Sequence, residues 1–443
     1  MSTTHFRIAA EEIVAPYENP DNGSGPMWCY GSPTIARDGE QVFVSLPQVG
    51  KDVPPLCNTR WQLFCRGKNK WQRVNVSPNF DEREPCPLVR LPGGRLLLSV
   101  NPSSSMRSRG ADGRESHYCE PQLLEFNASA PERGPASIRP RWDRDYQFTE
   151  HSYRGIAGDH RTGEILLLNI DGYAGQAWSF LDSAGKWSAQ GLAAFPLRGA
   201  YPQVALRERA AYVMAVSDVV EPNRAWQEFK KKVTGRDWDF DFRQIYFTYT
   251  PDVTETDFSP ILTIASRDET AGLLRNQDMW IGPDGDAHLV YTDQNIWHTF
   301  MRDQFFPDTS ITISLRYCRV HEGKVIERRT LVEYIEDSGN QTDSQGHGLL
   351  PTSAAFHATE AGNLYLLYHV TCKDSSGAEA AGNYILALLP QTDAGPAKLD
   401  LKHLFSSFFT AGERLGTVPS STIDLYGPGS EPNTMRYAQI EIC

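Results

Sequence analysis

Short apolar runs alternate with turns rich in glycine or proline along most of the chain, and almost no segment has helical periodicity. One unit recurs, in which a strand-like segment is followed by a turn with glycine and then by a second apolar strand. A repeat of this kind is the signature of a stacked or circular architecture. Seven copies are found, the last of them weaker, at residues 32–45, 86–99, 153–169, 201–216, 277–291, 352–368 and 421–442.

Most copies are followed by a second hairpin, as at residues 61–74, 177–187 and 315–326. Two hairpins in succession make four antiparallel strands, which is one blade of a β-propeller. The sequence therefore predicts an all-β fold, a seven-bladed β-propeller of four-stranded antiparallel blades, as a single domain over residues 1–443. Six or eight blades stay open as alternatives. A strand near residues 5–9 is expected to complete the last blade and close the ring.

Two segments, 224–232 and 296–305, have the character of helices, and each comes directly after the second strand of a repeat. They mark loop insertions near 217–242 and 293–314. The loop after the second strand of a blade opens on the same face as the loop that enters the first strand. Function is expected on that face, on loops held by a rigid scaffold.

The chain has 443 residues and a formal net charge of −12. Nucleic-acid binding needs clustered Lys and Arg, and the only short basic run is at 230–232, so no nucleic-acid partner is expected. No apolar stretch is long enough to span a membrane. The first residues lack the apolar centre of a signal peptide, which predicts a cytoplasmic protein, or a secreted one if the numbering is that of a processed form.

The loops of the predicted functional face carry many ionisable and aromatic side chains. They come from six different blades, and Arg, His and Tyr are more frequent among them than in ordinary polar loops. The candidates for substrate binding in this set are Arg60, Arg83, Glu84, Asn101, Glu150, Asp218, Asp278, Arg302 and His347.

The most informative stretch is 150–155, in which His151 stands beside Tyr153 and Arg154 at the entry to a strand. Such a His is suited to act as a base in a cationic pocket. Tyr201, directly before Pro202, is the equivalent residue one blade further. The predicted catalytic residues are therefore His151, Tyr201, Arg154 and Tyr153. The alternative, that His151 and Tyr201 only pack against neighbouring blades, stays open.

No cofactor is firmly indicated. His347 lies between two glycines and is a candidate channel residue, and a divalent metal held by His151, His347 and carboxylates stays open. No ligand spacing supports such a metal site. In the 217–242 insertion, Trp226, Phe229 and Trp238 either form one wall of a sugar-binding cleft or pin the insertion onto its blade.

The chain resembles bacterial propeller proteins with neuraminidase-type repeats, and especially the seven-bladed polysaccharide lyases that include the ulvan lyases. In those enzymes a His opens one blade and a Tyr before Pro opens the next. His151, followed by the turn at 157–159 and the strand at 166–168, resembles the first, and Tyr201 with Pro202 the second. The stretches at 150–155 and 219–223 also resemble an uncharacterised group of bacterial propellers. The Asp-box turns typical of sialidases are not evident.

One departure from the lyases stands out. They carry an Arg on the strand after that Tyr, whereas residues 211–218 end here in Ser217 and Asp218. The arginine that meets the substrate carboxylate would then be Arg154, Arg60, Arg83 or Arg302.

The resemblance implies a carbohydrate-active enzyme that cleaves a uronate-containing oligo- or polysaccharide by β-elimination, with an acidic glycan as its partner. His151 or Tyr201 would take the C5 proton, and the other would protonate the leaving oxygen. A glycoside hydrolase stays open as an alternative, with two carboxylates about 5–9.5 Å apart. The candidates for these carboxylates are Glu82, Glu84, Glu150, Asp218 and Asp278. A non-catalytic glycan-binding propeller also stays open.

Overall fold

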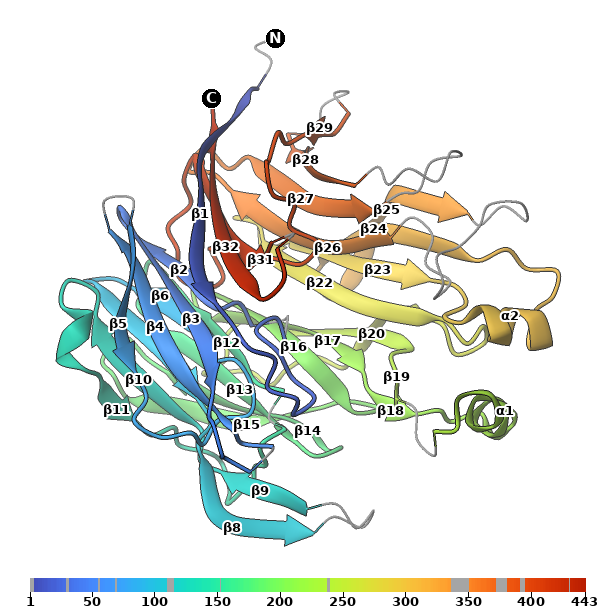
Figure 1. Cartoon of the computed structure of the whole chain (residues 1–443), viewed down its shortest axis with the longest axis horizontal. Helices are drawn as coiled ribbons and strands as arrows, with labels where there is room; N and C mark the ends of the chain where they lie inside the picture. The colour runs from blue at the N-terminus through green and yellow to red at the C-terminus, as the bar shows by residue number, and fades with distance from the viewer. Residues whose placement is uncertain are drawn as a thin grey trace.

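A computed structural model describes residues 4–28, 32–54, 56–67, 70–109, 115–151, 153–236, 240–335, 350–371, 381–390, 395–429 and 431–443. Over these residues the chain forms seven four-stranded antiparallel sheets arranged as the blades of a propeller (Figure 1). The predicted fold is confirmed. None of the helices described is long and apolar enough to cross a membrane.

The first three blades follow one another along the chain. Their strands are β2 (Ile35–Asp38), β3 (Gln41–Val49), β4 (Thr59–Gly67) and β5 (Lys70–Val76); β6 (Leu88–Leu91), β7 (Arg95–Val100), β10 (Gln122–Asn127) and β11 (Ala136–Ile138); and β12 (Gly155–Gly158), β13 (Ile165–Asp171), β14 (Gly175–Leu181) and β15 (Trp187–Ala194). The second blade also carries the hairpin β8 (Ser103–Arg109) and β9 (Glu115–Cys119), and the short helix η1 (Pro131–Arg133).

In the next three blades, as in the first three, the strands follow one another from the centre of the propeller outward in chain order. Their strands are β16 (Gly199–Arg207), β17 (Ala210–Ser217), β20 (Gln244–Thr250) and β21 (Leu262–Ser266); β22 (Leu273–Ile281), β23 (Ala287–Gln294), β24 (Thr312–His321) and β25 (Lys324–Ile335); and β26 (Leu350–Ala358), β27 (Leu364–Thr371), β28 (Gly382–Leu389) and β29 (Ala397–Lys398). Insertions add the pair β18 (Val219–Val220) and β19 (Phe240–Asp241), and the helices α1 (Arg224–Thr234) and α2 (Thr299–Phe305).

The seventh blade joins both ends of the chain. It consists of β30 (Phe409–Thr410), β31 (Thr422–Pro428), β32 (Thr434–Ile442) and, as its outermost strand, β1 (Phe6–Pro16). Figure 1 shows β1 running beside β32, and the two strands pair from Phe6↔Ile442 to Pro16↔Thr434. The expected ring closure by the N-terminal strand is confirmed, and it ties the first blade to the last through one continuous chain.

Two details of the sequence prediction are wrong. The segment at 421–442 was expected to supply the first two strands of the last blade, but it forms the second and third. The innermost strand is β30, which is only two residues long and has too little pattern to be seen. Helix α2 begins at Thr299 rather than near Ile296, because its N-cap residue His298 has extended backbone angles.

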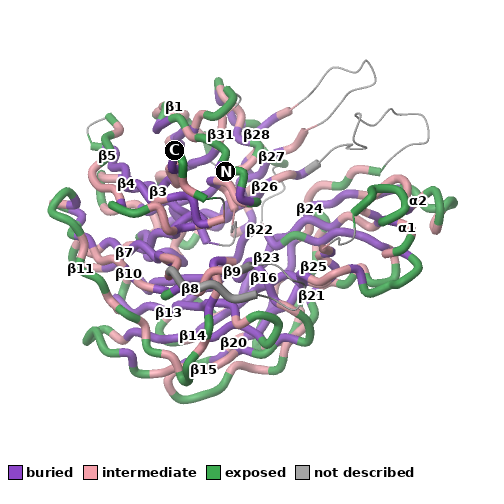
Figure 2. Tube along the Cα trace, turned by 60° about the horizontal axis from the view of Figure 1, so that its bottom comes forward, coloured by how far each residue is buried: buried purple, intermediate pink, exposed green. Residues whose placement is uncertain are grey.

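Burial follows the distance from the propeller axis. The inner and middle strands are almost wholly buried, whereas the outer strands β5, β11 and β15 contain exposed and half-buried residues (Figure 2). Leu, Ile, Val and aromatic side chains fill the spaces between neighbouring blades, as in the cluster around Leu96, Leu98 and Phe126. Such close packing makes the blades a rigid scaffold for the loops that they carry.

The central channel is closed at one end by the segment 411–417, which follows β30. The backbone nitrogens of Arg90 and Gly158 donate hydrogen bonds to the carbonyl oxygens of Leu415 and Arg414, at 2.9 and 3.0 Å. Gly416 lies so close to the Arg90 carbonyl that a Cβ atom would be 1.7 Å from its oxygen, and its φ is +78°. Only glycine fits there. We call this segment the plug. It contacts Gly158 at the end of β12, whereas His151 precedes the start of that strand, so the plug and His151 lie at opposite ends of the channel.

Candidate active site

His151, Tyr153 and Tyr201 lie in one row of contacting rings, where blades three and four begin. The ring centroids are 4.2 Å apart for His151 and Tyr153 and 4.4 Å apart for Tyr153 and Tyr201. The two tyrosine hydroxyl oxygens are 3.4 Å apart. Trp28 packs against both ends of the row, with ring centroids 6.3 Å from His151 and 5.8 Å from Tyr201. We call these four residues the aromatic row.

Both tyrosines of the row have left-handed backbone angles, with φ of +33° at Tyr153 and +49° at Tyr201. Large side chains rarely adopt such angles, which cost of order 1–3 kcal/mol each. Tyr201 and Pro202 also lie in the register shift where β16 pairs with β17, between Ala200 and Gln203. The fold thus maintains strained backbone at both positions, as functional sites often do.

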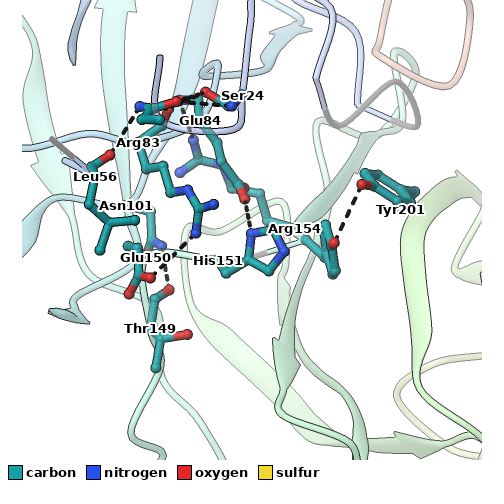
Figure 3. A network of polar contacts seen from close by, with 12 residues as sticks. Ser24, Leu56, Arg83, Glu84, Asn101, Thr149, Glu150, His151, Arg154 and Tyr201 are labelled. Atoms are coloured by element: carbon teal, nitrogen blue, oxygen red, sulfur yellow. Dashed lines mark hydrogen bonds and ion pairs between the residues drawn. The ribbon is translucent and has the colours of Figure 1, made fainter. Parts of the chain in front are cut away.

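The imidazole of His151 is oriented by Glu84, whose Oε1 lies 3.1 Å from Nδ1 (Figure 3). Burial by itself would raise the pKa of the Glu84 carboxyl. The hydrogen bond and charge of His151, with the positive charges of Arg83 and Arg154, instead lower that pKa to about 2. An ionised carboxylate only accepts hydrogen bonds, so Nδ1 carries the proton and Nε2 is the atom that can accept one.

Three further candidates hold the segment around His151 in place. Arg83 Nη1 contacts Glu150 Oε1 at 3.4 Å, and Glu150 Oε2 accepts a hydrogen bond from the backbone nitrogen of His117 at 2.8 Å. The side-chain nitrogen of Asn101 donates to the Thr149 carbonyl at 3.2 Å. Figure 3 shows this network on the side of His151 away from Tyr201.

Arg154 is only 2% exposed. Its Nη2 donates to the Pro85 carbonyl at 2.8 Å and lies 3.6 Å from Glu82 Oε2. Burial raises the pKa of Glu82 to about 7, against the lowering effect of Arg154. The structure thus brings Arg154 next to the row, but behind Glu84, where it supports the loop rather than faces a ligand.

The structure places the remaining candidates elsewhere. Arg60 lies in the first blade, over the ring of Phe80 at 4.5 Å and bonded to Gln48. Arg302 lies on α2, at the outer edge of the propeller in Figure 1, where its Nε bonds to Asp303. Asp278 lies outside the row itself but lines the central cavity that Tyr201 and Trp28 also line, and His347 lies outside the described residues. Among the residues described, no three or more His, Cys, Asp or Glu side chains are grouped as metal ligands.

Asp218 reaches the row through Arg198, a residue that the sequence did not single out. Arg198 Nη1 lies 3.2 Å from Asp218 Oδ2, and its guanidinium covers the ring of Tyr153 at 4.8 Å. Burial, followed by the charge of Asp218, raises the pKa of Tyr153 well above its ordinary value despite Arg198. Tyr153 therefore keeps its proton at neutral pH. Both Trp28 and Arg198 lie in segments that precede the innermost strand of a blade. His151 was predicted from this same position, so the position could also have indicated Trp28 and Arg198.

The aromatic residues of the 217–242 insertion pin it in place. Trp226 packs on Phe306 and Phe229 on Phe305, with ring centroids 5.8 and 5.3 Å apart. Helix α1 is thereby joined to α2 of the next blade. Trp238 lies outside the described residues. The insertion contacts the aromatic row directly through Phe242, whose ring centroid is 5.9 Å from that of Tyr201, and indirectly through Asp218 and Arg198.

Replacement of Glu84 by Gln is expected to destabilise the fold at pH 7 by about 2 kcal/mol, since a charged buried hydrogen bond is lost. The pKa of Glu84 in the fold is below its ordinary 4.5, so its stabilisation is complete above about pH 4.5 and declines as the pH falls toward 2. Urea denaturation of both proteins between pH 7 and 3 should show their difference shrinking below pH 4.5. A difference that stays constant with pH would contradict this assignment.

A scan against models of known protein families finds no match for this chain, and a search of curated protein sequences finds none either. Solved structures of similar architecture include a family 25 ulvan lyase bound to -[GlcA(1-4)Rha3S]-, with 10% identity over 97% of this chain and 94% of that one, at a TM-score of 0.52. They also include a protein of unknown function from Dyadobacter fermentans, with 9% identity over 99% of both chains, at a TM-score of 0.44. A third, an α-L-arabinanase from Penicillium chrysogenum, is 10% identical over 100% of this chain and 99% of that one, also at 0.44. The first likeness shows a shared propeller fold.

Proposed function

We propose that the protein is a lyase that cleaves a uronate-containing oligo- or polysaccharide by β-elimination. The observation that carries this proposal is the row of His151, Tyr153 and Tyr201, in which Glu84 contacts one imidazole nitrogen, no described residue is hydrogen-bonded to the other, and phenolic hydroxyls stand beside the ring. The lyase that shares the fold is bound to a glycan containing glucuronate, which agrees with a substrate of this class.

The reaction needs one base, one acid and one cation. A positive group neutralises the uronate carboxylate and makes the C5 proton acidic. Nε2 of His151 takes that proton, the C5–H electron pair forms the C4=C5 double bond, and the C4–O bond breaks. Tyr201 gives its hydroxyl proton to the leaving oxygen, with Tyr153 as its hydrogen-bonding neighbour. The products are a chain that begins with an unsaturated uronate and a second chain with a new reducing end, and no water is consumed.

A glycoside hydrolase would need two carboxyl groups facing the substrate. All five carboxylates that sequence reasoning offered for this role are buried and already paired. Glu82, Glu84 and Glu150 are 2%, 2% and 5% exposed, and Asp218 and Asp278 are 2% and 7% exposed. Their partners are Arg154, His151, Arg83, Arg198 and Arg414. Each of these carboxylates would have to give up its ion pair to act on a glycosidic bond, which supports elimination over hydrolysis.

The test is to mix the purified protein with uronate-containing oligosaccharides and follow ultraviolet absorbance together with new reducing ends. Elimination predicts that both rise in proportion, because each cleavage creates one conjugated double bond. New reducing ends without absorbance would overturn the lyase proposal in favour of hydrolysis. Binding without any cleavage would support the non-catalytic glycan-binding alternative.

A further inference from the structure

A cavity of about 610 Å³ occupies the central channel beside the aromatic row. Tyr201 and Trp28 belong to both, and the plug residues Gly412, Glu413 and Arg414 line the cavity at the opposite end. Its walls are largely apolar, with side chains of Phe242, Met279, Trp280, Phe356 and Phe408. The size suits a small ligand or one end of a larger one. Because the plug closes the far end, a ligand that fills the cavity would enter from the face of His151.

Most charges in this cavity are already compensated. Arg414 Nε donates to Asp278 Oδ1 at 2.9 Å, and Asp278 Oδ2 accepts from the Phe356 backbone nitrogen at 2.8 Å. Glu413 lies 3.2 Å from Arg207 Nη1 and accepts a hydrogen bond from the Trp280 indole at 2.8 Å. These two ion pairs therefore leave little net charge on the cavity wall.

Arg275 is different. It lies on the innermost strand β22, paired with Thr292 of β23, and its side chain lines the cavity. It is an exposed residue on a strand whose other members are buried or half-buried. None of the described residues forms an ion pair or a side-chain hydrogen bond with it, so its guanidinium is an uncompensated positive charge. The strand has a register shift between Asn276 and Asp278, directly after Arg275.

We propose that Arg275 binds the carboxylate of the uronate substrate, an inference that rests on the function proposed above. The planar guanidinium of arginine matches a carboxylate with two parallel, charge-assisted hydrogen bonds. Each arginine suggested by the sequence has another partner or is buried, whereas Arg275 shares one cavity with Tyr201. An arginine on an inner strand of blade five thus takes the place left by Ser217 and Asp218 in blade four.

The experiment measures binding without turnover, by calorimetric titration of D-glucuronate into the wild-type protein, Arg275→Gln, Arg275→Lys and the control Arg224→Gln. Arg224 is an arginine exposed on α1 and outside the cavity. Glucuronate should bind the wild type and the control equally, Arg275→Gln about 10- to 100-fold more weakly, and Arg275→Lys in between. Neutral glucose should not distinguish the four proteins. Thermal denaturation verifies that each variant is folded.

Equal glucuronate affinity in the wild type and Arg275→Gln would overturn the proposal, as would a wild type that binds glucose as well as glucuronate. Glucose 6-sulfate serves as a third ligand, and tighter binding of this sulfate would overturn the choice of a carboxylate. The two proposals fail separately. If glucuronate binding depends on Arg275 but no oligosaccharide is eliminated, the reaction is wrong and the carboxylate site stands.

Discussion

His151→Ala is expected to lower kcat on a uronate oligosaccharide by about 10²–10⁴-fold, the usual contribution of a positioned acid or base. The imidazole has one nitrogen committed to Glu84 at 3.1 Å, and its side chain is 24% exposed, so the other nitrogen can meet a substrate. Initial rates of ultraviolet absorbance measure the effect. KM should change little, because the imidazole acts on the proton and not on the carboxylate.

Tyr201→Phe should lower kcat to a similar degree, since it removes only the hydroxyl 3.4 Å from that of Tyr153. Tyr249→Phe is the matched control: Tyr249 stacks on Tyr212 in the same blade, with ring centroids 6.1 Å apart, away from the row. If His151→Ala and Tyr201→Phe both keep kcat within about two-fold of the wild type, the acid–base roles assigned here are wrong. Loss in the control as well would indicate damage to the blade.

Arg243→Met is expected to cost about 3–5 kcal/mol of folding stability, because it leaves part of a buried ionic cluster uncompensated. Arg243 is 1% exposed and contacts Glu221 and Asp241, and Lys230 Nζ contacts Asp241 at 2.8 Å and Glu221 at 3.2 Å. The cluster joins α1 to the strands β18 and β19. Urea denaturation at pH 8 measures the change.

The control for this prediction is Arg224→Gln, which removes an exposed pair with Glu228 on the same helix and should cost less than about 0.5 kcal/mol. Burial raises the pKa of Asp241 to about 7, against Arg243 and Lys230. Without Arg243 that pKa rises further, so ionisation of Asp241 costs the folded variant more free energy. The loss of folding stability relative to the wild type should therefore grow as the pH rises above 7. A loss below about 1 kcal/mol at pH 8 would refute the structural role of the cluster.

The same cluster bears on the site. Phe242, between Asp241 and Arg243 in the chain, lines the cavity and packs against Tyr201. Loosening the cluster should therefore lower activity in the variant molecules that remain folded. The stability of the insertion and the shape of the cavity wall are thus linked through one residue.

The sequence by itself determined the blades. Alternation of apolar strands with glycine turns is a local property, and turns such as the one at Gly163, with φ of +74°, need only their own residues. The same rule, applied at strand entries, found His151, Tyr153, Tyr201 and Glu84, which the structure brings together. It failed for β30, whose two residues have strand structure only because β31 pairs with them.

The tertiary structure decided which of the charged side chains are free. The sequence gives no sign of which of Arg83, Arg154 and Arg275 is paired in the fold. Their partners are distant in the chain, so only the tertiary structure distinguishes the three arginines. Arg83 meets Glu150 from 67 residues away, Arg154 meets a carbonyl 69 residues away, and Arg275 meets no side-chain partner among the described residues. The closure of the channel at one end likewise depends on a distant contact, the close approach of Gly416 to the Arg90 carbonyl. Local pattern fixes strands and turns, whereas charge compensation and closure depend on residues that only the folded ring brings into contact.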